Sequence, residues 1–168
     1  QIGEEESYIN LGDISSSICN KLIHRHPHVF KNVDIDMNKV DKTWEELKKE
    51  EKGEATVTEG LQRIPEFLPA LTKAEKIQHK AALVGFDWDN IDDVYKKIEE
   101  EYKELLDECK SRNIKYIKEE LGDLLFSIVN LARFLKIDPE ESLNLTNNKF
   151  IKRFKFIEDN AKLMNKSV

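Results

Sequence analysis

Two acidic clusters separated by a short polar break are the feature that most constrains how this chain can fold. The stretch from Lys97 to Asp123 reads KIEEEYKELLDECKSRNIKYIKEELGD. The polar residues at 110–115 predict a turn between two helices, so that the clusters face each other across a hairpin. On the second helix Glu120 and Asp123 share a polar stripe with Ser127 and Asn130, and the remaining positions are rich in Leu and Ile. A helix this apolar is predicted to be largely buried.

The acidic residues of the first helix do not all face the same way. At about 100° per residue, Glu101 and Glu104 lie on one stripe, whereas Glu100 points about 100° away from Glu101. Glu108 also falls on the stripe, but we interpret it as a surface residue. Converging carboxylates in a core need a counter-charge or take up protons. Since Mg²⁺ prefers oxygen ligands, the pattern favours a magnesium site.

The spacing EExxE at Glu100–Glu104 followed by ExxD at Glu120–Asp123 resembles the MazG family of nucleoside triphosphate pyrophosphohydrolases. The run from Glu120 to Glu158 is similar to that family along its whole length, and so is KIQHKAALVGFDW, which ends at Trp88. The resemblance implies an all-α bundle of the MazG type. It also implies hydrolysis of nucleoside triphosphates to the monophosphate and pyrophosphate, and a homodimer.

The resemblance assigns roles residue by residue. It implies Mg²⁺, with Mn²⁺ as a substitute, on four carboxylates: Glu101, Glu104, Glu120 and Asp123. Glu100 and Glu101 are the predicted catalytic residues, with Glu100 as the group that orients or deprotonates water. Predicted contacts to the substrate are Lys97, Asn130, Asn147, Lys149 and Arg153. Phe86 and Trp88 precede the metal helix and are candidates for stacking on the base, but anchoring the core is an equal alternative.

Composition narrows the class of protein. Charged residues make up 36% of the 168 residues and the net charge is −6, so no basic surface for nucleic acid is expected. No apolar run approaches the roughly 18 residues of a membrane helix, and no signal-peptide core is present at the start. Cys19 and Cys109 are predicted to be buried free thiols rather than a disulfide. These features predict a cytoplasmic protein. Because the chain begins with Gln1 and not Met, we expect further residues upstream.

The chain is predicted to be all-α, in three parts. Residues 1–52 resemble the end of a first MazG domain, through NKLIHRHPHVF at 20–30. They are expected to form one helix with Asp13 as its cap, ending before Pro27, and a second over 38–51. Residues 53–60 are predicted to be a linker and 61–168 the catalytic domain. There, one helix runs to about residue 84 with Gly85 as its C-cap, the hairpin follows, and a last helix starts at Asp138 and Pro139 and ends near residue 162.

Two alternatives to this function stay open. One is a related all-α pyrophosphohydrolase that acts on phosphoribosyl-ATP or on dUTP. The other is a non-catalytic module that senses nucleotides or binds partners. Relatives often continue past the last helix with a tail that reaches the nucleotide, whereas this chain stops at Val168. The LGD motif at 11–13 repeats that at 121–123, but Asn10 replaces the Glu of ExxD, so we predict one metal site per chain.

Overall fold

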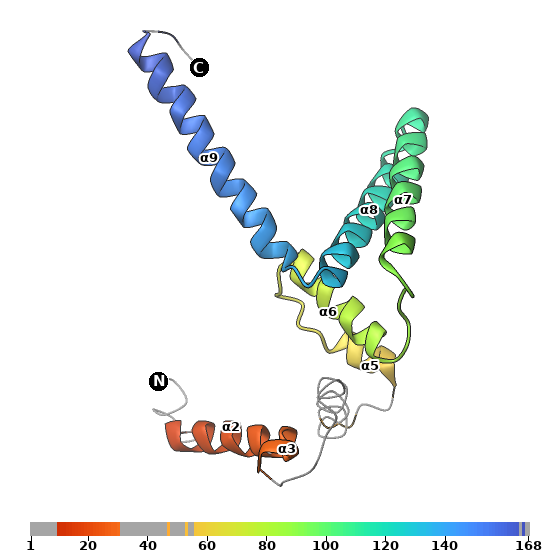
Figure 1. Ribbon diagram of the computed structural model, residues 1–168, viewed down its shortest axis with the longest axis vertical. Coiled ribbons are helices and arrows are strands. Elements are labelled where there is room, and N and C mark those ends of the chain that lie inside the picture. The colour runs from red at the N-terminus through yellow and green to blue at the C-terminus, as the bar shows by residue number, and fades with distance from the viewer. Residues whose placement is uncertain (1–9, 31–46, 48–52, 54–55, 165, 167–168) are drawn as a thin grey trace. The chain divides into compact units, whose positions relative to one another are not determined.

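The computed structural model describes residues 10–30, 47, 53, 56–164 and 166, and every regular element among them is a helix (Figure 1). The all-α prediction is therefore confirmed. The packing of the chain divides it into two units, Gln1–Gly60 and Leu61–Val168. Within the described part of the chain, no helix is both long and apolar enough to cross a membrane.

The first unit contains α2 (Leu11–Arg25) and the short α3 (Pro27–Phe30). The N-cap of α2 is Asn10, three residues before the predicted cap at Asp13. Asn10 Oδ1 accepts from the Asp13 amide at 2.9 Å, and Asp13 Oδ2 accepts from the Asn10 amide at 3.2 Å. Asp13 thus completes a reciprocal capping box from inside the helix, which explains why it looked like a cap in the sequence. The helix predicted over 38–51 lies outside the described residues, apart from Leu47.

Part of the predicted linker is helical. Residues 57–60 belong to α5 (Val57–Gln62), so the prediction of a linker over 53–60 is wrong there. The hydroxyl of Thr56 accepts a hydrogen bond from the Glu59 amide at 3.2 Å, which caps the first turn. The TVTEG sequence therefore starts a helix, and its glycine, Gly60, is buried rather than exposed as in a linker.

The second unit is built on α6 (Ala70–Leu83), α7 (Ile91–Ser111), α8 (Ile114–Phe134) and α9 (Pro139–Leu163). The C-cap of α6 is Val84, one residue before the predicted Gly85, and Gly85 follows it in the left-handed region with a φ of 87°. Asp138 caps α9, as predicted. Asn90 and Asn113 cap α7 and α8. Arg112, with a φ of 57°, reverses the chain between them, so the predicted hairpin is confirmed.

The core of the second unit is small. The helices α7 and α8 pack side by side, α6 packs on α8, and the deepest side chains, Val94 and Val129, are each 1% exposed. The prediction that α8 is largely buried is wrong for this single chain, because several of its apolar side chains are about half exposed, among them Leu121, Leu125 and Ile128. On α9 all residues from 141 to 157 are exposed. Large apolar helix faces are therefore left without a covering element in the described chain.

The two cysteines were predicted to be buried. Both Cys19 and Cys109 are free thiols, as expected, but both are exposed. The prediction assumed that the apolar faces of α2 and α7 are covered within the chain. On α2 no residue is buried, and on α7 the apolar face that packs on α8 leaves Leu106 and Cys109 exposed near the C-terminal end, which is why the burial was overestimated.

Candidate metal centre

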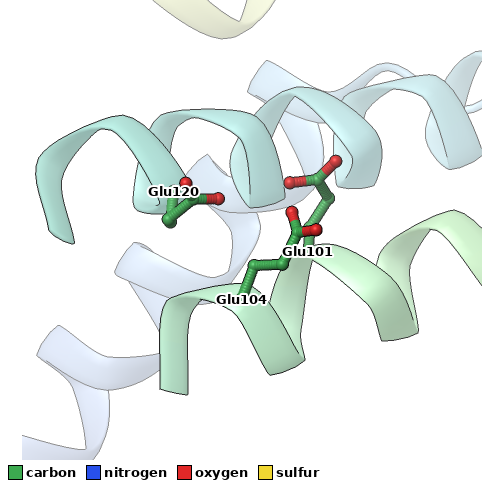
Figure 2. Close-up of side chains that lie close together, drawn as sticks. All are labelled: Glu101, Glu104 and Glu120. Atoms are coloured by element: carbon green, nitrogen blue, oxygen red, sulfur yellow. The ribbon is translucent and has the colours of Figure 1, made fainter. Parts of the chain in front are cut away.

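Three carboxylates from two helices converge in the hairpin. Glu101 and Glu104 come from α7 and Glu120 comes from α8, and one oxygen of each lies within 4.8 Å of the others (Figure 2). Glu101 is only 5% exposed, Glu120 is half-buried and Glu104 is exposed. The cluster therefore has a buried floor and an open side.

The geometry of the hairpin explains this convergence. Glu101 and Glu104 are one helical turn apart, so they lie on the same face of α7. Glu104 and Glu120 stand the same number of residues before and after Arg112, at which the chain reverses. Since both helices rise equally per residue, the antiparallel packing brings these two side chains level with each other.

Lys97 is the cation nearest to the cluster. Its Nζ lies 2.9 Å from Glu100 Oε1 and 2.7 Å from Glu101 Oε1. The hydrogen bonds to Glu100 and Glu101 raise the pKa of Lys97 well above its usual range, so it stays charged at any physiological pH. Because this one charge is shared between two carboxylates, it does not neutralise the cluster.

Glu120 experiences the resulting excess of negative charge. Partial burial raises the pKa of Glu120 above its ordinary value, and the charges of Glu104 and Asp123 raise it further. Among the described residues, no hydrogen bond or ion pair satisfies Glu104 or Glu120. An oxygen-only donor set with unbalanced negative charge fits a hard divalent cation such as Mg²⁺.

The other predicted acidic residues lie beside the cluster. Asp123 is exposed and falls outside the group of three, although its charge acts on Glu120. Glu100 is exposed and is held by Lys97. Glu108 is half-buried, and its carboxylate accepts a hydrogen bond from Ser111 at the end of α7.

The predicted phosphate contacts on α9 do not join the cluster in the described chain. Asn147, Lys149 and Arg153 are all exposed, and no hydrogen bond or ion pair links these α9 residues to α7 or α8. Asn130 is half-buried on α8, where its Oδ1 accepts from Arg133. Of the predicted set, only Lys97 lies against the carboxylates.

The two aromatic candidates lie between α6 and α7. Phe86 is 82% exposed and Trp88 is 42% exposed. Of the two predicted alternatives, an anchor in the core does not fit Phe86 in the described chain. Phe86 and Trp88, which precede α7 and are exposed, remain candidates for stacking on the base.

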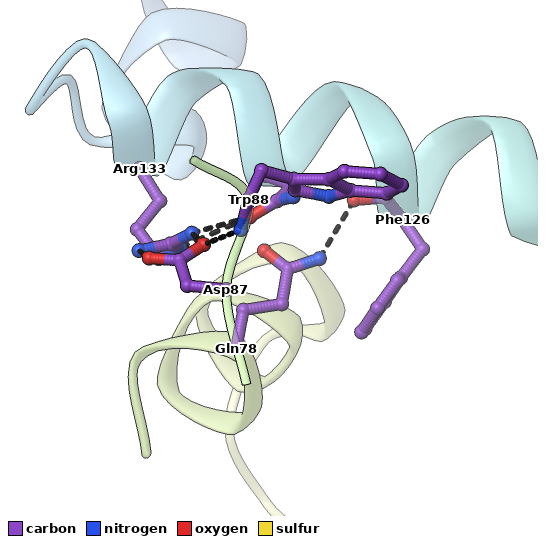
Figure 3. A network of polar contacts seen from close by, with 6 residues as sticks. Gln78, Asp87, Trp88, Phe126 and Arg133 are labelled. Atoms are coloured by element: carbon purple, nitrogen blue, oxygen red, sulfur yellow. Dashed lines mark hydrogen bonds and ion pairs between the residues drawn. The ribbon is translucent and has the colours of Figure 1, made fainter. Parts of the chain in front are cut away.

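Sequence reasoning missed three polar residues that fix this segment and α6 to α8. Arg133 binds both Asp87 and Asn130, and Gln78 donates to the Phe126 carbonyl at 2.7 Å (Figure 3). The available signal was a polar side chain, Gln78 or Arg133, on an otherwise apolar helix face. Such a side chain is seldom buried without a hydrogen-bonding or charged partner. The partners are far away in sequence, so the pattern alone could not name them.

The fold and the cluster together define an all-α protein with a candidate divalent-cation site in a helical hairpin. Residues 1–30 and 90–157 match the model of the MazG nucleotide pyrophosphohydrolase domain. The chain therefore belongs to the MazG family, as the spacing of its acidic residues predicted.

Curated relatives agree with this assignment. The chain is 43% identical over 159 residues to the nucleoside triphosphate pyrophosphohydrolase/pyrophosphatase MazG of Thermotoga maritima, covering 95% of this chain and 60% of the relative. It is 40% identical over 161 residues to the nucleoside triphosphate pyrophosphohydrolase of Escherichia coli, covering 94% and 61%. It is 48% identical over 164 residues to the uncharacterized protein YabN of Bacillus subtilis, covering 96% and 33%. The chain thus spans at most about three fifths of the length of these relatives.

Proposed function

We propose that this chain hydrolyses nucleoside triphosphates to the nucleoside monophosphate and pyrophosphate, with Mg²⁺ as cofactor. The convergence of Glu101, Glu104 and Glu120 within 4.8 Å carries the proposal. Membership of the family supports the chemistry. The activities for which the Thermotoga and Escherichia relatives are named support the substrate class.

The three clustered carboxylates are the residues that would hold the cation. Asp123 is the fourth, because it lies one turn from Glu120 on α8 and its charge already acts on that side chain. A cation held there supplies positive charge that stabilises the negative charge on the phosphate oxygens. Mn²⁺ also accepts carboxylate oxygens and is expected to substitute.

Glu100 is the residue that we assign to the attacking water. Its side chain is 56% exposed, compared with 7% for Glu101, and Lys97 fixes its carboxylate at the edge of the cluster. The water oxygen bonds to the α-phosphorus, and the bond from that phosphorus to the bridging oxygen breaks. Glu100 takes the proton of the water and pyrophosphate leaves with the bridging oxygen. Glu101 would contribute as one of the carboxylates that hold the cation.

Basic and amide side chains are proposed to hold the substrate. Lys97 borders the carboxylates and remains charged, so it is placed to contact a phosphate. Lys149 and Arg153 are one turn apart on α9, with Asn147 close by, and can form a second set of phosphate contacts. On Asn130 the Oδ1 atom is taken by Arg133, which leaves the amide nitrogen as a donor toward substrate.

A second copy of this chain is the partner that we propose. On α9 the apolar side chains of Phe150, Phe154 and Ile157 are 66%, 43% and 51% exposed, and α8 adds a further open apolar face. Surfaces of this kind mark an interface when they are contiguous. A homodimer would cover these apolar faces. It would also give Lys149 and Arg153 on α9 a way to reach a carboxylate cluster, in the same copy or in the partner copy.

Release of pyrophosphate from a panel of ribo- and deoxyribonucleoside triphosphates tests the proposal. Products are separated by ion-exchange chromatography after incubation with Mg²⁺ and, in parallel, with EDTA. Monophosphate and pyrophosphate should appear only with Mg²⁺. Activity confined to dUTP or phosphoribosyl-ATP would select the narrower enzyme, and binding without turnover would select a sensing module.

A matched pair of variants ties the activity to the cluster. Glu120→Gln should abolish turnover, whereas Glu119→Gln should not, because Glu119 is exposed and outside the group of three. The two changes are chemically identical and adjacent. Full activity in both variants, or no metal-dependent release from any nucleotide by the wild type, would refute the proposal.

A further inference from the structure

A charged clamp ties the segment between α6 and α7 to the C-terminal end of α8. The guanidinium of Arg133, on α8, donates from Nη1 to Asp87 Oδ2 at 3.0 Å and from Nη2 to Asp87 Oδ1 (Figure 3). The same side chain donates from Nε and Nη2 to Asn130 Oδ1, at 3.0 and 2.9 Å. It therefore holds one carboxylate with a fork of two bonds and an amide oxygen with two more, a geometry that Lys cannot reproduce.

The clamp is shielded from water mainly on the side of Arg133. The side chain of Arg133 is 13% exposed, and its guanidinium carbon lies 5.0 Å from the centroid of the Phe134 ring. The side chain of Asp87 is 30% exposed. A partly exposed ion pair adds little net stability, because solvent screens the attraction and the more buried arginine is desolvated, so its function is better sought in what it orients.

The clamp orients two exposed aromatic residues. Asp87 stands between Phe86 and Trp88, and its Oδ1 also accepts from the Trp88 amide at 2.9 Å. The Asp87 carboxylate thereby holds the backbone at Trp88, the next residue, and links it to Arg133 on α8. Phe86 and Trp88 remain 82% and 42% exposed, so the anchored segment presents aromatic faces instead of packing them away.

The clamp also sets this segment relative to the carboxylate cluster. Asn130, which Arg133 holds, shares the polar stripe of α8 with Glu120 and Asp123. Along the α8 axis, Asn130 lies about 10 Å beyond Asp123 at 1.5 Å per residue. A ribose and its base, joined to a phosphate at the cluster, can span that distance.

We infer that Asp87 and Arg133 are positioning residues, which hold Phe86 and Trp88 as the surface on which the nucleobase of the substrate stacks. The inference rests on the proposed hydrolysis of nucleoside triphosphates and specifies how that site recognises the base. Aromatic faces stack on any base, so the surface provides affinity for the nucleoside with little discrimination between bases.

Kinetics can separate base binding from phosphate binding. Asp87→Asn removes the charge from the fork and should raise KM for nucleoside triphosphate by about tenfold or more, since misplacing a binding group by a small distance is costly. The kcat value should change much less. Inorganic tripolyphosphate has no base, so its inhibition constant against the wild type and the variant should be the same.

Asp107→Asn is the matched control. Asp107 pairs with Lys110 at 2.6 Å in an exposed ion pair of α7, so the change is chemically identical but leaves the aromatic segment untouched. Its KM should equal that of the wild type. Arg133→Lys should reproduce the effect of Asp87→Asn, because an ammonium cannot make the two parallel bonds to Asp87.

The position of the segment has its own readout. The chain contains two tryptophans, so a Trp44→Phe background leaves Trp88 as the sole emitter. Asp87→Asn in that background should make Trp88 fluorescence more sensitive to acrylamide quenching. Addition of nucleoside triphosphate should protect Trp88 in the parent and protect it less in the variant.

The outcomes are distinguishable. If the wild type releases no pyrophosphate, the proposed function fails, whereas an active wild type with unchanged KM in Asp87→Asn and Arg133→Lys overturns this inference alone. A rise in the tripolyphosphate inhibition constant equal to the rise in KM also overturns it, because the clamp would then act on the whole site. If both clamp variants fail to fold, Phe86→Leu tests the inference, because the Phe86 side chain is 82% exposed and the variant should fold. Its KM for nucleoside triphosphate must then rise, while the inhibition constant of tripolyphosphate stays the same.

Discussion

Replacing Glu120 with Gln separates two effects of the acidic cluster. One is the repulsion between its carboxylates, which destabilises the folded chain, and the other is the binding of Mg²⁺, which stabilises it. The two side chains have nearly the same shape, so the change removes a negative charge and leaves the packing of α8 in place. Partial burial and the charges of Glu104 and Asp123 raise the pKa of Glu120 in the folded chain. The folded state therefore favours a neutral side chain at this position. In EDTA near neutral pH, we expect Glu120→Gln to melt at a higher temperature than the wild type.

The pH dependence of this difference has a definite sign. The folded pKa of Glu120 lies above its ordinary value of 4.5. Its favourable contribution is then fully present below pH 4.5 and is lost as the pH rises through the raised pKa. In EDTA the wild type should lose stability relative to Glu120→Gln across that window, and the gap should be constant at higher pH.

Mg²⁺ should reverse the order of stability. The site exists only when α7 and α8 pack, because that packing brings Glu120 to Glu101, so the binding free energy adds to the free energy of folding. At one hundred times its dissociation constant the cation stabilises the folded state by about 2.7 kcal/mol. For a unit the size of Leu61–Val168 that is a rise of roughly 10 °C in Tm. Glu120→Gln should lose most of this rise.

Thermal melts by far-ultraviolet circular dichroism measure both effects. The wild type, Glu120→Gln and the exposed control Glu119→Gln are compared in EDTA and in Mg²⁺. The control should follow the wild type in both conditions. Equal Mg²⁺-dependent rises in the wild type and Glu120→Gln would refute the assignment of Glu120 to a metal site.

Other substitutions test α9 and the core. Arg153→Ala should lower kcat/KM for nucleoside triphosphate by at least about tenfold, through loss of a charge-assisted phosphate contact, and an unchanged value would remove Arg153 from the site. Val129→Ala should lower the free energy of unfolding, measured by urea denaturation, by about 2 kcal/mol, since the Val129 side chain is 1% exposed. Val84→Ala is the control and should lower it little, because Val84 is 59% exposed. Equal losses in the two variants would contradict the packing described. Phe154→Glu should turn a dimer into a monomer by light scattering, whereas a dimer that persists would place the interface away from this face of α9.

Local chemistry made much of the fold predictable. The sequence Asp138-Pro139 starts α9 as predicted, because Asp138 Oδ1 accepts from the Glu140 and Glu141 amides and Pro139 needs no donor at that position. The two acidic motifs predicted that Glu101, Glu104 and Glu120 lie together, because helical geometry and a short turn fix the positions of these residues relative to one another. Signals of this kind depend only on neighbours within one or two turns.

The remaining features depend on contacts between distant residues. Asp87 and Arg133 are 46 positions apart, and neither residue carries a local sign of the other. The exposure of α8 was misjudged for a related reason: apolar periodicity indicates that a face is to be covered, but not whether this chain or another one covers it. The helix at Val57–Gln62 was missed because the composition of 53–60, with Gly53 and Gly60 at its ends, was interpreted as a linker and the Thr56 cap was not recognised.

Hydrolysis in water enriched in the heavy oxygen isotope tests the central claim most directly. Wild-type protein is incubated with Mg²⁺ and a nucleoside triphosphate, and both products are analysed by mass spectrometry. The account predicts nucleoside monophosphate that carries the label, unlabelled pyrophosphate, and neither product from Glu120→Gln. Label in the pyrophosphate, or formation of nucleoside diphosphate and phosphate, would contradict attack at the α-phosphorus by a site built on these carboxylates.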